Sequence, residues 1–98
     1  MYEYMADIDL PSTFTEEFLG LIPAQRDIVN KLMSEGVILS YAVSIEHGKL
    51  WMIVAAENER SVSELVKSFP IAGHISCTVY KLTFHNNINL KMPSFSLN

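Results

Sequence analysis

The chain has 98 residues, 49% of them hydrophobic and 18% charged, and a formal net charge of −4 at pH 7. A chain of this length forms one domain that buries roughly two-thirds of the surface exposed by its unfolded form. Its 7 basic residues are scattered among 11 acidic ones, so it lacks the basic stripe of nucleic-acid-binding proteins, and we expect no nucleic-acid partner.

Cysteine content and hydropathy suggest where the protein works. Cys77 is the single cysteine and cannot form an intramolecular disulfide. The amino-terminal residues lack the basic and apolar regions of a secretory signal, and no apolar run approaches the length of a membrane-spanning helix. These features predict a cytoplasmic protein with no membrane partner.

The first third of the chain predicts a strand followed by a long helix. Residues 2–8 place their side chains alternately on two faces, as in a strand, and Pro11 then ends the pattern. From about Thr15 to Glu35, apolar residues recur at helical spacing, and Gly36 is a natural stop.

Pro23 falls inside this predicted helix. Proline removes one helical hydrogen bond and crowds the preceding turn. We therefore expect either a kink near Gly20 or a fresh helix that begins at Ile22-Pro23.

The stretch from Val37 to Ala56 predicts a β-hairpin folded about His47-Gly48. Two runs rich in β-branched and aromatic residues flank this break, and glycine supplies the positive φ of a two-residue turn. In that register Ser44 faces Trp51.

Side chains of the hairpin alternate between two faces. The predicted core face carries Leu39, Tyr41, Val43, Ile45, Leu50, Met52, Val54 and Ala56. The second face carries Ser40, Ala42, Ser44, Trp51, Ile53 and Ala55.

A second helix and a last strand complete the predicted elements. Asn58 can cap the helix, Ser61 with Glu64 forms an alternative capping box, and Pro70 ends it. The segment from His74 to Phe84 then has the alternation of a strand.

This order of elements, β-α-β-β-α-β, predicts an α+β, ferredoxin-like fold with a four-stranded antiparallel sheet and two helices on one face. We assign the domain to residues 1–86. Residues 87–98 form a tail with apolar residues at Ile88, Leu90 and Met92, which we expect to dock on its own domain or on a neighbouring subunit.

The second face of the sheet is too apolar to lie in water and predicts a homodimer or larger homo-oligomer formed through the sheet. Trp51, beside Ser44 and Ser40, could instead form the wall of a pocket for a flat ligand. Tyr41 could present its hydroxyl to a cavity between sheet and helices, or be an ordinary core tyrosine. These four residues are the candidate ligand-binding residues.

Evidence for catalysis is sparse. His74 could reach the mouth of a cleft as a general base, and Tyr41 is a second weak candidate. His47 lies in the predicted turn, and His85 is eleven residues beyond His74, on the opposite strand face. No cysteine or carboxylate stands at a metal-ligand spacing from them, so we expect no metal.

A set of structural residues recurs along the chain in the pattern of a known family. They are Asp7, Leu10, Pro11, Gly36, Leu65 or Val66, Pro70, Val79 and Leu82. From Gly36 to Leu82, and in its opening Asp7–Pro11, the chain resembles the muconolactone isomerase family. The resemblance implies a dimeric α/β barrel that acts on lactones without a cofactor.

The chain departs from that family at its polar positions. The family has a Trp-Arg pair where this chain has Ala42-Val43, and its arginine, asparagine and aspartate are replaced by Val43, Leu50 and Ala55. Lactone isomerisation needs a base and an oxyanion donor, which these side chains cannot supply. We therefore predict an oligomeric protein of this class that binds a small apolar metabolite, either as a cofactor-independent isomerase, as a non-catalytic binding protein or as a cofactor-free monooxygenase.

Overall fold

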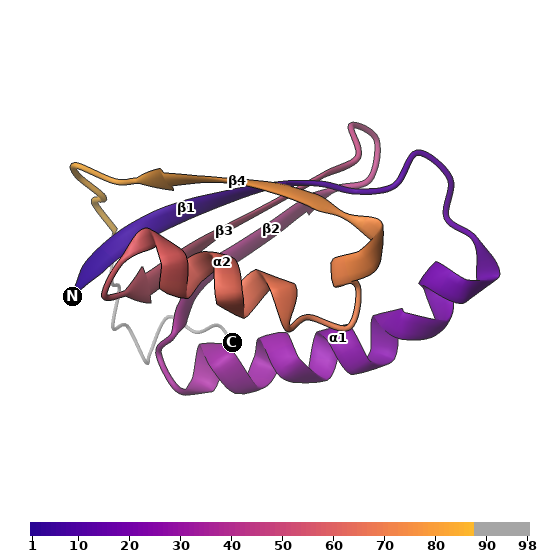
Figure 1. Ribbon diagram of the computed structural model, residues 1–98, viewed down its shortest axis with the longest axis horizontal. Helices are drawn as coiled ribbons and strands as arrows, with labels where there is room; N and C mark the ends of the chain where they lie inside the picture. The colour runs from indigo at the N-terminus through magenta and orange to yellow at the C-terminus, as the bar shows by residue number, and fades with distance from the viewer. Residues whose placement is uncertain (88–98) are drawn as a thin grey trace, which may run out of the picture.

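The computed structural model describes residues 1–87 as a four-stranded antiparallel sheet with two α-helices on one face (Figure 1). The elements are β1 (Tyr2–Asp9), α1 (Glu16–Ser34), β2 (Ile38–Ser44), β3 (Lys49–Ala56), α2 (Glu59–Lys67), the short 3-10 helix η1 (Ala72–His74) and β4 (Ser76–Lys81). The strand order β2-β3-β1-β4 makes β2 and β4 the edges. The predicted ferredoxin-like fold is confirmed.

α1 is a single helix despite its internal proline. Thr15 caps it by accepting a hydrogen bond from the backbone N–H of Phe18 at 3.1 Å. Pro23 lies inside the helix, so the alternative of a fresh helix at Ile22-Pro23 is wrong. Phe18 and Val29, on either side of the proline, are both buried against the sheet side. This shared packing offsets the lost hydrogen bond.

The hairpin register differs from the predicted one by two residues. Ser44 pairs with Lys49, and Trp51 pairs with Ala42. The connection is a four-residue turn over 45–48, closed by a hydrogen bond from Gly48 N–H to the Ile45 carbonyl oxygen at 3.2 Å. Because side chains alternate with a period of two, this shift leaves most residues on their predicted faces.

An irregularity in β2 changes one assignment to the core. The pairing with β3 shifts between Ile38 and Ser40, as in a β-bulge. Ile38 is consequently buried, whereas Leu39, which we expected on the core face, is only partly buried. The bulge reverses the alternation at this one point.

The second helix begins where predicted, and the last strand does not. Asn58 caps α2 by accepting a hydrogen bond from Ser61 N–H at 2.9 Å. His74 belongs to η1, in which its N–H bonds to the Ile71 carbonyl at 2.9 Å. The prediction that β4 opens at His74 is therefore wrong, because this turn delays the strand to Ser76.

The core lies between the sheet and the helices. Its most deeply buried large side chains are Ile8, Ile38, Met52, Val54, Val62 and Ile71. Within residues 1–87 no helix has both the length and the apolar character needed to cross a membrane. The docking predicted for the tail concerns residues 88–98, which lie outside the described part.

Candidate ligand-binding cavity

A largely apolar cavity of about 680 Å³ lies between α1 and the β2–β3 side of the sheet, on the helix-covered face. Cavities of 300–1,000 Å³ typically hold small-molecule ligands. One wall comes from α1, the other from β2 and β3, and the loops before α1 and after α2 contribute Phe14 and Ile71. Three separate segments of the fold thus line it.

The wall from α1 follows from the helical repeat. Phe18, Ile22, Gln25 and Val29 are spaced by four, three and four residues, so they share one face of the helix, and all four line the cavity. The Phe14 ring, 4.9 Å from the Phe18 ring between centroids, extends this wall beyond the helix start.

The wall from the sheet contains residues that sequence reasoning assigned to the core. Tyr41, Val43 and Leu50 line the cavity on the helix side, as does Ile45 in the turn. Val43 and Ile45 are 48% and 64% exposed, because they extend past the helices. They were expected to be buried, and their exposure corrects that prediction.

The mouth of the cavity is apolar on both sides. Leu19 and Met33 of α1 are exposed and line it, facing Val43 and Ile45. Exposed apolar side chains gathered around a hollow mark a binding surface more often than isolated ones do. Arg26 and Asn30, both exposed, add polar groups there.

Gln25 is the polar residue inside the cavity that sequence reasoning missed. Its side chain is only 3% exposed, and its Oε1 accepts a hydrogen bond from Ile71 N–H at 3.4 Å. Its Nε2 is buried, and the amide lies within hydrogen-bonding reach of the Tyr41 side chain. The available signal was its position on the helical stripe, one turn after Ile22 and one turn before Val29.

Tyr41, a candidate from the sequence, enters the same cavity from β2. Burial raises the pKa of its phenol, and a side-chain hydrogen bond from Gln25 opposes this shift by favouring the phenolate. Because the net shift is upward, the hydroxyl stays protonated at neutral pH and can donate a hydrogen bond.

The other three candidate binding residues lie on the opposite face of the sheet. Ser40, Ser44 and Trp51 pair with Ile53, Lys49 and Ala42 and share the uncovered face. The sheet itself separates them from Tyr41. Their proposed role in binding stays a prediction, and the cavity described here does not include them.

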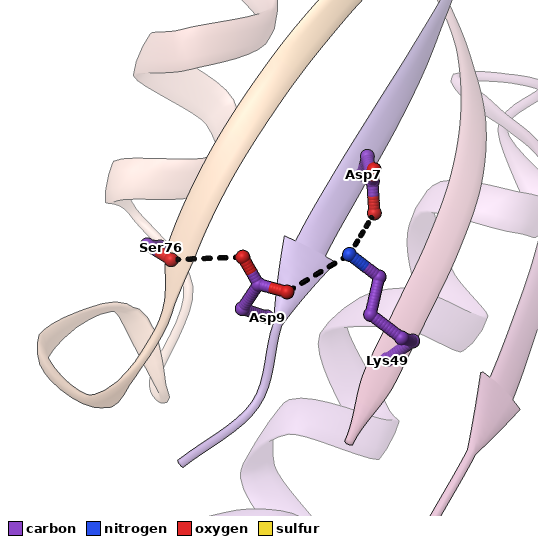
Figure 2. A network of polar contacts seen from close by, with 4 residues as sticks. All are labelled: Asp7, Asp9, Lys49 and Ser76. Atoms are coloured by element: carbon purple, nitrogen blue, oxygen red, sulfur yellow. Dashed lines mark hydrogen bonds and ion pairs between the residues drawn. The ribbon is translucent and has the colours of Figure 1, made fainter. Parts of the chain in front are cut away.

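A charged network occupies one end of the uncovered face (Figure 2). Lys49 Nζ lies 2.6 Å from Asp7 Oδ1 and 2.8 Å from Asp9 Oδ1. Ser76 donates a hydrogen bond to Asp9 Oδ2 at 3.4 Å. Hydrogen bonding and charge attraction from Lys49 lower the pKa of Asp9, and hydrogen bonds to Asp7 and Asp9 raise that of Lys49.

Neither the comparison with protein-family models nor that with curated proteins finds a match. The similarity to muconolactone isomerases therefore stays a prediction, and the geometry of the cavity carries the functional argument.

His74 and His85 each have a local partner. The His74 ring packs edge-on against Phe18, with centroids 5.6 Å apart, and its Nε2 lies 3.9 Å from a carboxylate oxygen of Glu17. His85 Nδ1 lies 2.7 Å from Glu3 Oε1. His74, the candidate base, packs behind Phe18 and does not line the cavity.

Proposed function

We propose that the cavity between α1 and β2 binds one small, largely apolar molecule. The observation that carries the proposal is an apolar hollow of about 680 Å³ lined by side chains of α1, β2 and β3. A folding core normally fills such space. A ligand would fill it.

The residues around the cavity favour binding over proton-transfer chemistry. Its ionisable lining residues are Arg26 and Tyr41, and neither is a base at neutral pH. Val43 and Leu50, at positions where the resemblance implies arginine and asparagine, contribute apolar surface to the same cavity. A non-catalytic binding protein thus fits these side chains better than a lactone isomerase or a monooxygenase.

A cavity-filling variant tests the binding function. Naphthalene, titrated calorimetrically, should bind the wild-type chain, and Leu19→Trp should weaken binding at least tenfold because the new ring occupies the mouth. Ala24→Trp places the same ring on an exposed position of the same helix and should change nothing. Equal binding by the two variants, or none by the wild-type chain, would contradict the proposal.

The uncovered face of the sheet supports self-association as part of this proposal. Ile53 and the partly buried Trp51 and Met5 lie on it, and the exposed Tyr80 adds a further aromatic surface. A second copy packed on this face would cover them and give a homodimer or a larger homo-oligomer. The half-buried free thiol of Cys77 is compatible with the cytoplasm, the compartment that we propose.

Native mass spectrometry tests the assembly with a matched pair of variants. Wild-type protein should be detected as an oligomer. Ala42→Glu should give the monomer, because it would bury a charge beside Trp51 in the proposed interface between sheets. Ala24→Glu makes the same change on α1 and should keep the oligomer. A monomeric wild-type chain would rule out this interface.

A further inference from the structure

The polar groups inside the cavity are paired within the protein. Oε1 of Gln25 accepts a hydrogen bond from Ile71 N–H at 3.4 Å, and the Gln25 amide forms a second side-chain hydrogen bond with Tyr41. Other inner lining residues, such as Phe18 and Leu50, are apolar. The part of a ligand that enters the cavity must therefore be apolar, and a polar group on that ligand has to lie at the mouth.

The polar side chains of the mouth come from α1. Leu19, Arg26, Asn30 and Met33 are spaced by seven, four and three residues, so they share one face of the helix. Arg26 and Asn30 are neighbours on this face, one turn apart, and the apolar Leu19 and Met33 lie to either side. A guanidinium and an amide, both able to donate hydrogen bonds, thus lie next to each other at the edge of an apolar hollow.

The charge at the mouth is opposite to that of the chain as a whole. The net charge of the chain is −4, yet within residues 1–87 the lining of this cavity contains no aspartate or glutamate and one cation, Arg26. None of the ion pairs found in the described part involves Arg26. Its guanidinium is therefore available to a negatively charged group, and the planar fork of donors matches a carboxylate.

The end of the cavity near the start of α1 is acidic instead. A second hollow of about 520 Å³ adjoins the cavity there. The two share the lining residues Leu10, Phe14 and Ile45. Asp9 and Glu46 line the second hollow, and among residues 1–87 no lysine or arginine does. Lys49 balances Asp9 (Figure 2), but Glu46 would repel a carboxylate at this end. The charges therefore favour a ligand whose anionic group points toward Arg26.

We infer that the ligand is an apolar molecule with a single carboxylate, whose body fills the cavity and whose carboxylate is held at the mouth by Arg26, with Asn30 as a further donor. This inference rests on the proposed binding function and names its ligand class. The exposed position lets the charged group keep part of its hydration while the apolar body leaves water. One guanidinium balances one carboxylate, whereas it would leave a doubly charged phosphate partly unbalanced.

The test compares two probes of the same shape at neutral pH. 2-Naphthoate carries the carboxylate, and the neutral 2-acetylnaphthalene has a methyl group in place of one carboxylate oxygen. Calorimetry should show that both bind the wild-type chain. Arg26→Gln should weaken binding of 2-naphthoate roughly three- to tenfold and leave binding of the ketone unchanged. Because Arg26 is exposed, the variant should fold, and its unchanged binding of the ketone would verify this.

Arg60→Gln provides the matched control. It makes the same substitution at an exposed position of α2, outside the lining of the cavity, and changes the net charge by the same amount. Binding of both probes should stay as in the wild-type chain. High salt should weaken binding of 2-naphthoate to the wild-type chain, and not that of the ketone, because salt screens the attraction of Arg26.

The outcomes separate this inference from the function on which it rests. If 2-acetylnaphthalene binds but 2-naphthoate does not, or if Arg26→Gln affects the two probes alike, the carboxylate assignment is overturned and the binding function stands. Tighter binding of 2-naphthylmethylamine than of 2-naphthoate would overturn it in favour of a cationic group beside Glu46. If neither 2-naphthoate nor 2-acetylnaphthalene binds the wild-type chain, both proposals fail.

Discussion

The two helices cover the same face of the sheet in different ways. α2 has 9 residues and packs chiefly on β4, with Val62 and Val66 buried and Phe69 following them into the core. α1 has 19 residues, yet only Phe18, Gln25 and Val29 are buried, and one of these is an amide. A longer helix therefore gives the less complete cover, and the space left beneath α1 is the cavity.

The position of each helix relative to the sheet accounts for this difference. β2 is an edge strand, and its residue Val43, with Ile45 in the turn, extends past the helix layer into the cavity mouth. α2 instead contacts the inner strands β1 and β3 as well as the edge strand β4. We interpret the α2 side as the main source of stability and the α1 side as the place of the proposed binding function.

The largest effect on this comparison should come from truncating the α2 side. Phe69 is 4% exposed, so Phe69→Ala should lower the free energy of unfolding by about 3–5 kcal/mol. Met33→Ala, at the cavity mouth, should cost about 1 kcal/mol or less because that side chain is already exposed. Urea denaturation measures both, and equal losses would contradict the assigned roles.

Alternation of side chains made most of the fold predictable. Leu50, Met52 and Val54 were assigned to the core and are buried, although the hairpin register was two residues off. The length of the turn was not predictable, because Gly48, at φ 63°, suits a four-residue turn as well as a two-residue one. The bulge at Leu39 could not be predicted from the sequence. Residues 37–39 are all apolar, so the hydrophobic pattern does not show which of them faces the core.

The cavity was less predictable than the fold. Its existence depends on how far α1 stands from the sheet, and periodicity describes directions but not distances. Tyr41 was correctly placed on the helix side of β2 by its parity. Gln25 was overlooked because a single glutamine within a helix is usually solvent-exposed, and only its place between Ile22 and Val29 marks it as inward-facing.

A smaller effect should follow from raising the pH, and it probes the α1 side specifically. Burial raises the pKa of Tyr41 above its ordinary value of 10.0. Above pH 10 the unfolded chain therefore loses this proton before the folded chain does, so the stabilising contribution of Tyr41 is complete below that pH and is lost as pH rises through the folded value.

Tyr41→Phe should accordingly show a shallower loss of stability than the wild-type chain between about pH 9.5 and 11.5, measured by urea midpoints. Cys77, whose pKa is also raised by burial, contributes in the same direction, so both chains should carry Cys77→Ala. If stability falls equally steeply with pH in both chains, the Tyr41 hydroxyl is no more buried than the hydroxyl of an exposed tyrosine.

The smallest effect should lie on the face that neither helix covers. A hydrogen bond from Lys49, together with the attraction of its positive charge, lowers the pKa of Asp9 below its ordinary value of 3.8. The folded carboxylate then resists protonation more than the unfolded one, so its contribution to stability is present above about pH 4 and is lost as pH falls through the folded value.

Lys49→Met should reduce this loss of stability at acid pH, measured by urea titration. Lys67→Met, which removes an exposed lysine at the end of α2, should leave the loss unchanged. The difference should be small and fade in 1 M NaCl, because Asp9 is exposed and salt screens its attraction to Lys49. If stability falls with pH in the same way in the two lysine variants, the network in Figure 2 contributes nothing to stability. The covered face of the sheet would then be the source of stability.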